Sequence, residues 1–329
     1  MFAESFEIVS AMMSPAQAAG SSQFHHHHHG GGSWLTIWSS NPRVIVGLGL
    51  MALVYGAGLY RLWARAGKGA GVSTGRAASF GAGWLTLVIA LLSPLDAIAG
   101  ELFAIHMIQH LLIILVAAPL VVSGAPFFVA LWVLPKEVRR RVASAFNRDS
   151  GMRASWDVMS QPLLVWSAFF ATLWLWHIPG LYEAALRSQL IHDIQHLGFM
   201  VAACMTWWIL LNPMGRLRLT RGTGVLYLFT TALHGAALGV LLTFSRQGWY
   251  DYYEQTTAAW GLTLLQDQQI AGVIMWMPAS LLYIGLAAWV LTLWIRESET
   301  ADRKLMRFAA SRGSSSIEDD RQRLLNGMR

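Results

Sequence analysis

Two pairs of histidines in the sequence have the spacing of metal ligands on a helix. His106 and His110 form one His-x-x-x-His pair, and His192 and His196 form the other. Residues four apart on a helix share one face, so each pair can direct two ring nitrogens toward one point. Imidazole is a good ligand for copper, zinc and iron. The spacing therefore predicts one metal site that the two pairs share.

The elements that must position these pairs are membrane helices. The chain has 329 residues, of which 55% are hydrophobic and only 13% are charged, whereas soluble domains have about 25% charged residues. Without strand alternation, a membrane-spanning chain must satisfy its backbone within helices. The sequence thus predicts an all-α, polytopic membrane protein, a bundle of about seven transmembrane helices of about 20 apolar residues each. The expected spans are 43–63, 79–99, 102–122, 161–178, 190–211, 223–245 and 269–295.

These spans divide the chain into three regions. We expect a disordered periplasmic tail at 1–42, a seven-helix transmembrane domain at 43–296 and a cytoplasmic tail at 297–329. The first tail contains five consecutive histidines, His25 to His29, followed by a linker-like Gly-Gly-Gly-Ser. This tract is interpreted either as an engineered or fortuitous run or as a metal-collecting tail.

Two shorter features bear on packing. The apolar piece at 125–134 is too short to span and is bounded by Pro126 and Pro135, so we expect an interfacial or re-entrant extension of the third span. Gly235 and Gly239 in the sixth span form a small-xxx-small pair suited to close helix packing.

The charges in the loops predict the orientation of the bundle. Most lysines and arginines lie in alternate connections, at 64–78, 136–160 and 212–222, or follow the last span. Of the 24, the exceptions are Arg43, Arg187 and Arg246. By the positive-inside rule the N-terminus is outside and the C-terminus inside. The formal charge of +6 therefore reflects topology and does not indicate a nucleic-acid partner.

This topology brings the histidines toward the outer face of the membrane. The third and fifth helices enter from outside, so both pairs lie within roughly 12 Å of that face at about 1.5 Å per residue. The fourth helix ends there at His177, and His234 lies deeper, roughly 16 Å along the sixth helix. Ionisable side chains inside a membrane are costly and usually functional. The predicted metal ligands are His106, His110, His177, His192, His196 and His234.

Neighbouring side chains could add ligands or orient the imidazoles. Met107, Met200, Met275 and Met277 carry thioethers, which select cuprous copper, although a methionine in a core can also serve apolar packing alone. Asp267, at the start of the seventh span, is a further possible ligand. Asp267 and Asp193 could instead accept a hydrogen bond from an imidazole, or lie at the membrane interface as ordinary charges.

Three blocks of this sequence resemble the multi-span CtaG-like family of cytochrome c oxidase assembly factors, the type found with caa-type oxidases. They run from His106 to Pro119, from Trp176 to His196 and from Asp267 to Pro278, within a similarity that covers about residues 43–296. The resemblance implies a multi-pass protein of the bacterial inner membrane that is needed to produce active oxidase, through copper delivery or insertion. It carries the metal role to His106, His110, His177, His192 and His196, and it does not extend to the histidine tract.

Three functions compete at this point. The leading hypothesis is an assembly factor that binds copper at the histidine cluster and passes it to an oxidase subunit by ligand exchange, without being an enzyme. Its expected partners are cytochrome c oxidase subunits, periplasmic copper chaperones and the lipid bilayer. The second is a haem-binding electron carrier or quinone reductase, with His106 or His110 opposite His192 or His196. The third is a copper transporter through Met200 and Cys204, which would need more donors in the inner half.

Overall fold

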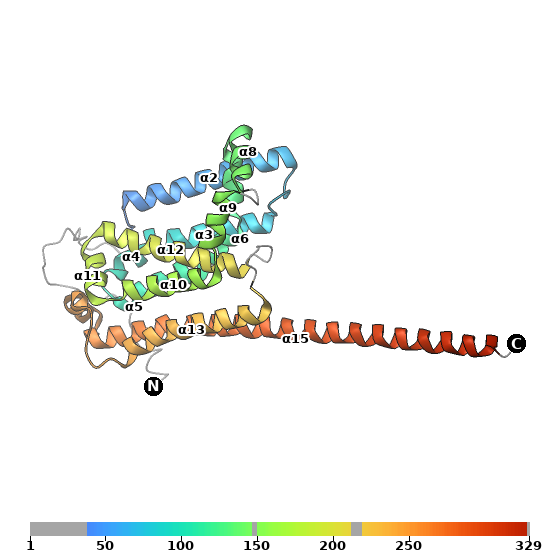
Figure 1. Cartoon of the computed structure of the whole chain (residues 1–329). Helices are drawn as coiled ribbons and strands as arrows, with labels where there is room; N and C mark the ends of the chain where they lie inside the picture. Colours follow the sequence, from blue (N-terminus) through green and yellow to red (C-terminus); the bar gives the residue numbers. More distant parts are fainter. Residues whose placement is uncertain (1–37, 147–149, 212–218, 328–329) are drawn as a thin grey trace.

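The computed structural model describes residues 38–146, 150–211 and 219–327, and the regular elements in this part of the chain are all helical (Figure 1). Six helices are long and apolar enough to cross a membrane, and one bent pair could supply a seventh span. The all-α, polytopic fold is therefore confirmed. The six are α2 (Pro42–Ala66), α3 (Thr74–Leu92), the segment Phe103–Ser123, α12 (Gln189–Leu211), α13 (Arg221–Phe244) and the Leu264–Thr300 part of α15 (Leu264–Gly327); the bent pair is α9 (Gly151–Met159) with α10 (Pro162–Trp176).

The second span and the connection before the fourth span differ from their predictions, whereas α10 lies within the span predicted at 161–178. The span expected at 79–99 begins earlier, at Thr74, and ends at Leu92, after which α4 (Pro94–Ala99) forms a separate short helix. Pro94 explains the break, because proline cannot donate a backbone hydrogen bond and disfavours a helical residue before it. The expected loop at 136–160 contains α8 (Lys136–Ala145) and α9, and α9 meets α10 at a bend of 55°.

The third span changes its helical pitch along its length. It begins as α5 (Phe103–Leu111), continues as the π-helical turn η2 (Leu112–Ala117) and ends as α6 (Ala118–Ser123). Pro119 has no N–H to donate within a regular α-helical turn, and its ring would crowd the preceding turn of the helix. The wider turn leaves the carbonyl of Ile114 to accept a hydrogen bond from the Trp207 indole at 2.8 Å. Single π-helical turns of this kind occur frequently at functional sites.

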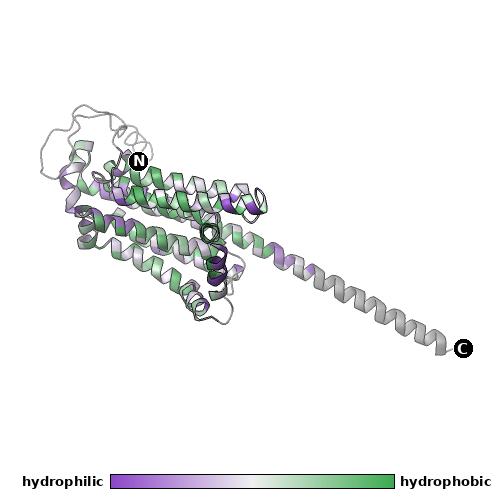
Figure 2. Cartoon of the chain, turned by 90° about the horizontal axis from the view of Figure 1, so that it is seen from above, coloured by the Kyte–Doolittle hydropathy of each residue, from purple (hydrophilic) through white to green (hydrophobic). Residues whose placement is uncertain are grey.

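The helices lie side by side, with α2 at one edge of the bundle and the α13–α15 pair at the other (Figure 1). Short helices α7 (Pro126–Ala130) and η3 (Leu131–Val133) pack against α2, and they form the piece at 125–134 for which an interfacial or re-entrant extension is predicted. Apolar residues run along the spans, and hydrophilic residues gather toward the ends of the bundle (Figure 2). This distribution fits a bundle that is surrounded by lipid along its middle.

Glycine allows α13 and α15 to approach each other closely. A Cβ atom on Gly239 would lie 2.9 Å from the carbonyl oxygen of Gly272, and one on Gly272 would lie 2.7 Å from the carbonyl oxygen of Gly239. No atom lies within 4 Å of a Cβ built on Gly235. The close contact predicted for the Gly235–Gly239 pair is therefore made by Gly239 alone, with Gly272 as its partner.

The two ends of the bundle are connected to the tails in different ways. The helix α15 continues past residue 296 to Gly327 and extends far beyond the other helices (Figure 1). At the other end, Ser39 donates its N–H to the carbonyl of Leu92 at 2.8 Å, and the Asn41 side chain caps α2. The histidine tract His25 to His29 lies outside the described residues.

Candidate metal centre

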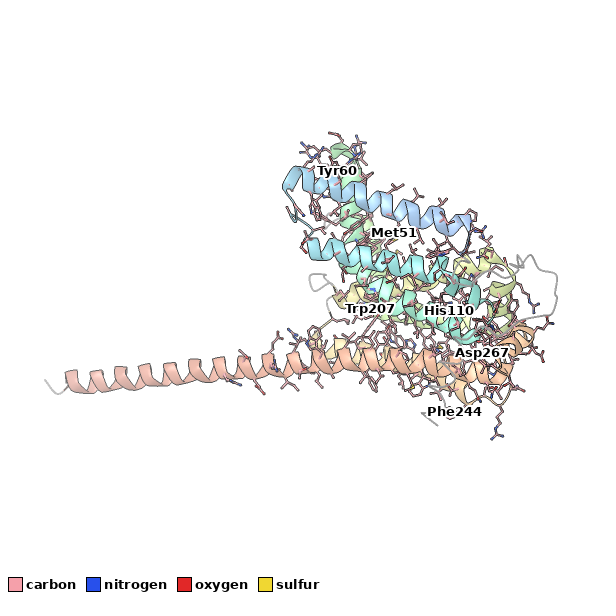
Figure 3. The ribbon with its side chains drawn as sticks, turned by 180° about the vertical axis from the view of Figure 1, so that it is seen from behind. Met51, Tyr60, His110, Trp207, Phe244 and Asp267 are labelled. Carbon is pink, nitrogen blue, oxygen red and sulfur yellow. The ribbon has the colours of Figure 1, made fainter. Side chains whose placement is uncertain are left out.

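Three of the predicted ligands meet at one point inside the bundle. His106 and His110 on α5 and His196 on α12 each offer a ring nitrogen, and these three atoms lie within 4.8 Å of one another. All three side chains are buried. The Nε2 atoms of His106 and His110 are 3.0 Å apart. We call His106, His110 and His196 the histidine cluster; His110 is labelled in Figure 3, within the bundle.

Two further histidines flank this cluster. The ring of His192 lies 4.2 Å from that of His196 and 5.2 Å from that of His106, measured between centroids. The ring of His177 lies 6.4 Å from that of His110, and its Nδ1 is 2.6 Å from the carbonyl oxygen of Leu173. The structure thus brings five of the six predicted histidines into one array.

The sixth, His234, lies apart from this array. Its ring is surrounded by Trp166, Phe169 and Phe170, with centroid separations of 5.4, 6.0 and 5.1 Å. It is 7% exposed, and neither nitrogen has a hydrogen-bond partner among the described residues. Its inclusion with the other five is not supported by its position, because its ring packs among aromatic side chains of α10 and not against the other histidines.

Asp267 fixes the beginning of the helix that carries His106 and His110. One of its oxygens accepts the N–H of Phe103 at 2.7 Å, and the other accepts the N–H of Ala104 at 3.0 Å. Both N–H groups belong to the first turn of α5, where a helix leaves its donors unpaired and a negative charge is favourable. Among the described residues, the hydrogen-bond partners of Asp267 are these two N–H groups and not an imidazole, so Asp267 caps the helix, and its role as a metal ligand stays a prediction.

Asp193 also has a partner other than an imidazole. It accepts hydrogen bonds from the Asn41 amide at 2.7 Å and the Arg43 guanidinium at 2.5 Å. These contacts tie the start of α2 to α12, next to His192. The expected hydrogen bond from an imidazole to Asp193 is replaced by this link between two helices.

Tyr253 determines which nitrogen of His106 carries a proton. Its hydroxyl lies 3.2 Å from the carbonyl oxygen of Ala99, 3.2 Å from the Tyr182 hydroxyl and 3.1 Å from Nδ1 of His106. Burial raises the pKa of Tyr253 well above its ordinary value, so the phenol keeps its proton. A carbonyl can only accept, so that single proton goes to Ala99, and Tyr253 accepts from the other two groups. His106 then carries its proton on Nδ1 and presents a bare Nε2 to the histidine cluster.

Residues 53–297 match the model of the cytochrome c oxidase caa3 assembly factor family. The chain belongs to this family. This agrees with the resemblance of the three sequence blocks that contain the histidine cluster and Asp267.

The chain is similar to three mycobacterial proteins. Uncharacterized proteins of Mycobacterium bovis and Mycobacterium tuberculosis are each 24% identical over 305 residues, which are 89% of this chain and 44% of theirs. One of Mycobacterium leprae is 22% identical over 306 residues, 90% of this chain and 44% of that protein. The chain thus spans less than half the length of these relatives. No solved structure matches it.

Several polar residues around the histidine cluster are not predicted from the sequence. Gln109 donates its amide to the carbonyl of Ala90 at 2.7 Å and to Asp96 at 2.8 Å, and burial raises the pKa of the Asp96 carboxyl. Gln109 lies inside the His106–His110 block, so its position gave a signal. Tyr182 and Tyr253 lie between spans, where helical spacing gives none.

The ring nitrogens of the histidine array fit a bound metal ion. In the described part of the chain, Nδ1 of His110 and Nε2 of His177 and His196 are buried and have no hydrogen-bond partner. Leaving a buried polar atom unpaired is costly, and such atoms need an explanation. The ring nitrogens of His106, His110 and His196 that lie within 4.8 Å of one another are suitable ligands for copper, zinc or iron. The donor set therefore fits a metal, and its chemistry is that of nitrogen ligands without a carboxylate.

Proposed function

We propose that this caa3 assembly factor binds copper at the histidine cluster and passes it to a cytochrome c oxidase subunit during assembly of the oxidase. Copper is the cargo in this proposal and not a resident cofactor. The single observation that carries it is the 3.0 Å contact between Nε2 of His106 and Nε2 of His110, with a ring nitrogen of His196 within 4.8 Å of both.

The separation of the two Nε2 atoms is suitable for one ion. With metal–nitrogen bonds of about 2.0–2.1 Å, nitrogens 3.0 Å apart subtend an angle of about 95° at the metal, slightly below the tetrahedral value. A small outward movement of one ring is enough to reach that value. Before copper arrives, the same contact is a hydrogen bond from His110 to the bare Nε2 of His106. The proton on His110 must therefore move to Nδ1 when copper binds.

Charge favours the cuprous ion as the cargo. Moving an ion into a low-dielectric interior costs free energy that rises steeply with its charge. The three imidazoles of the histidine cluster are neutral ligands, so a monovalent ion leaves one positive charge in the site, whereas a divalent ion leaves two. Transfer then needs only exchange of nitrogen ligands. No covalent bond of a substrate is made or broken, so we propose that the protein is not an enzyme.

The topology supports transfer at the periplasmic side of a bacterial inner membrane. The cluster lies where α5 and α12 begin and α10 ends, and the arginine-rich segment at 136–160 joins helices at their other ends. By the positive-inside rule the end with the cluster faces outward. A periplasmic copper chaperone could deliver the ion there, and an oxidase subunit could receive it.

The haem alternative is less well supported. The rings of the two pairs are close together, with centroid separations of 5.2 Å for His106–His192, 5.8 Å for His106–His196 and 5.2 Å for His110–His196. A haem iron takes its axial ligands from opposite faces of a wide macrocycle. Rings that already pack edge to face leave little space for that macrocycle between them.

The test in cells uses a strain that lacks the gene. Complementation with the wild-type gene should restore copper content and activity of the oxidase, whereas His106→Ala with His196→Ala should not. The matched control is His234→Ala, which removes a buried histidine away from the cluster and should complement. Normal oxidase copper in the strain without the gene would contradict the proposal.

A further inference from the structure

A cavity of about 50 Å³ lies next to the histidine cluster, on its membrane-interior side. Along the third span it is bordered by Met107, His110 and Ile114, and it reaches Tyr283 on α15. One water molecule needs roughly 10–15 Å³ of such space. The cavity is therefore large enough to hold an ion with its ligands drawn toward it. The proposed function does not involve this cavity.

Two histidines that carry an unpaired ring nitrogen line the cavity. His177 lines it and is 3% exposed. The carbonyl of Leu173 can only accept, so the contact at 2.6 Å requires the proton of His177 to be on Nδ1. Its Nε2 is then a bare lone pair, buried and without a partner. His110 also lines the cavity, and its Nδ1 is unpaired in the same way, while its Nε2 faces the histidine cluster.

Two methionines also line the cavity, among side chains that are mostly apolar. Met107 on α5 is 1% exposed and Met275 on α15 is 7% exposed, and both line the cavity. The other methionines considered as donors, Met200 and Met277, do not line it. Thioether and imidazole together form a donor set that selects cuprous copper over harder divalent ions.

We infer that the cavity is a second cuprous site, with the thioethers of Met107 and Met275 and Nε2 of His177 as its ligands. This inference rests on the proposed function, because the same ion enters at the histidine cluster. His110 belongs to the histidine cluster and also lines the cavity, so it lies between the two sites. Because His110 is not among the ligands of the cavity site, the cluster and the cavity can each hold one ion at the same time.

The experiment measures copper stoichiometry and the ligand atoms together. Full-length protein with His25–His29 replaced by serine is purified without nickel, loaded with Cu(I) under reducing conditions, and examined by X-ray absorption at the copper edge. The reference protein should bind two equivalents and show sulfur as well as nitrogen scattering. Met107→Leu with Met275→Leu should bind one equivalent, with nitrogen scattering only. Leucine keeps the volume and apolar character of methionine, so these variants should still fold.

Met200→Leu is the matched control, since Met200 is a partly buried methionine of α12 that does not line the cavity. It should keep two equivalents and the sulfur signal. One equivalent with no sulfur scattering in the reference protein would overturn this inference and leave the histidine cluster standing. Unchanged sulfur scattering in the double variant would also overturn it. Absence of bound copper would contradict both this inference and the proposed function.

Discussion

The carboxylate of Asp267 accepts the backbone N–H of Phe103 at 2.7 Å, across 164 residues of sequence. This contact joins the start of the last span to the first turn of the helix that carries His106 and His110. Asp267 is fully buried, and its second oxygen accepts the N–H of Ala104. These two contacts therefore fix the position of the histidine pair relative to the seventh span.

Replacing Asp267 with asparagine should destabilise the bundle. The asparagine oxygen can replace one of the two acceptors, but its amide would meet the second N–H. A buried hydrogen bond to a charged group is worth about 1.5–3 kcal/mol, so we expect a loss of stability of this size. Thermal unfolding in detergent measures it. Asp251→Asn, at an exposed position in the preceding loop, is the control and should change little; equal melting temperatures for the two variants would contradict the capping role.

Replacing Tyr253 with phenylalanine should weaken copper binding without unfolding the protein. The variant removes the acceptor that holds the proton of His106 on Nδ1, so Nε2 is no longer kept bare. Loss of a group that orients a metal-binding histidine typically costs about 10–100-fold in affinity. Competition with a chromophoric Cu(I) chelator measures this change. Tyr252→Phe, a partly buried neighbour, should bind as the wild type does, and an unchanged affinity in Tyr253→Phe would count against the tautomer argument.

Replacing Gly272 with alanine should separate α13 from α15. The new methyl group would lie 2.5 Å from the Thr243 hydroxyl and 2.7 Å from the Gly239 carbonyl oxygen, and the backbone must move to accept it. Overpacking of this kind costs about 1–3 kcal/mol. Gly285→Ala on the same helix has no atom within 4 Å of the added carbon and should not destabilise the protein. Melting temperatures of the two variants in detergent distinguish them.

The sequence was sufficient to predict the spans and most of the array because both depend on local patterns. Apolar runs mark the helices, and the four-residue spacing places His106 with His110 and His192 with His196. Topology then predicts that these pairs meet. The positions of Asp267 and Tyr253 could not be predicted in this way, because their partners are backbone groups and a histidine far away in the sequence. From the sequence alone, Asp267 resembles a metal ligand because it is a carboxylate near the histidines. The distances show that it contacts backbone N–H groups.

His234 illustrates the limit of the depth argument. Its distance along the sixth span suggested a place near the other histidines, but depth does not specify which side of a helix faces the cluster. In the structure its ring packs among Trp166, Phe169 and Phe170 instead. The same position makes it a useful control, since it is a buried membrane histidine with no contact to the proposed site.

The most direct test of copper binding at the histidine cluster is to measure the Cu(I) content of protein in which His106 and His196 are both replaced by alanine. The comparison is the His234→Ala variant. All proteins carry serine in place of His25–His29 and are checked for a folded, monodisperse state in detergent. We expect the double variant to lose the one copper equivalent that has only nitrogen ligands. We expect His234→Ala to retain the full wild-type copper content. Full copper content in the double variant, or an equal loss in His234→Ala, would contradict copper binding at the histidine cluster.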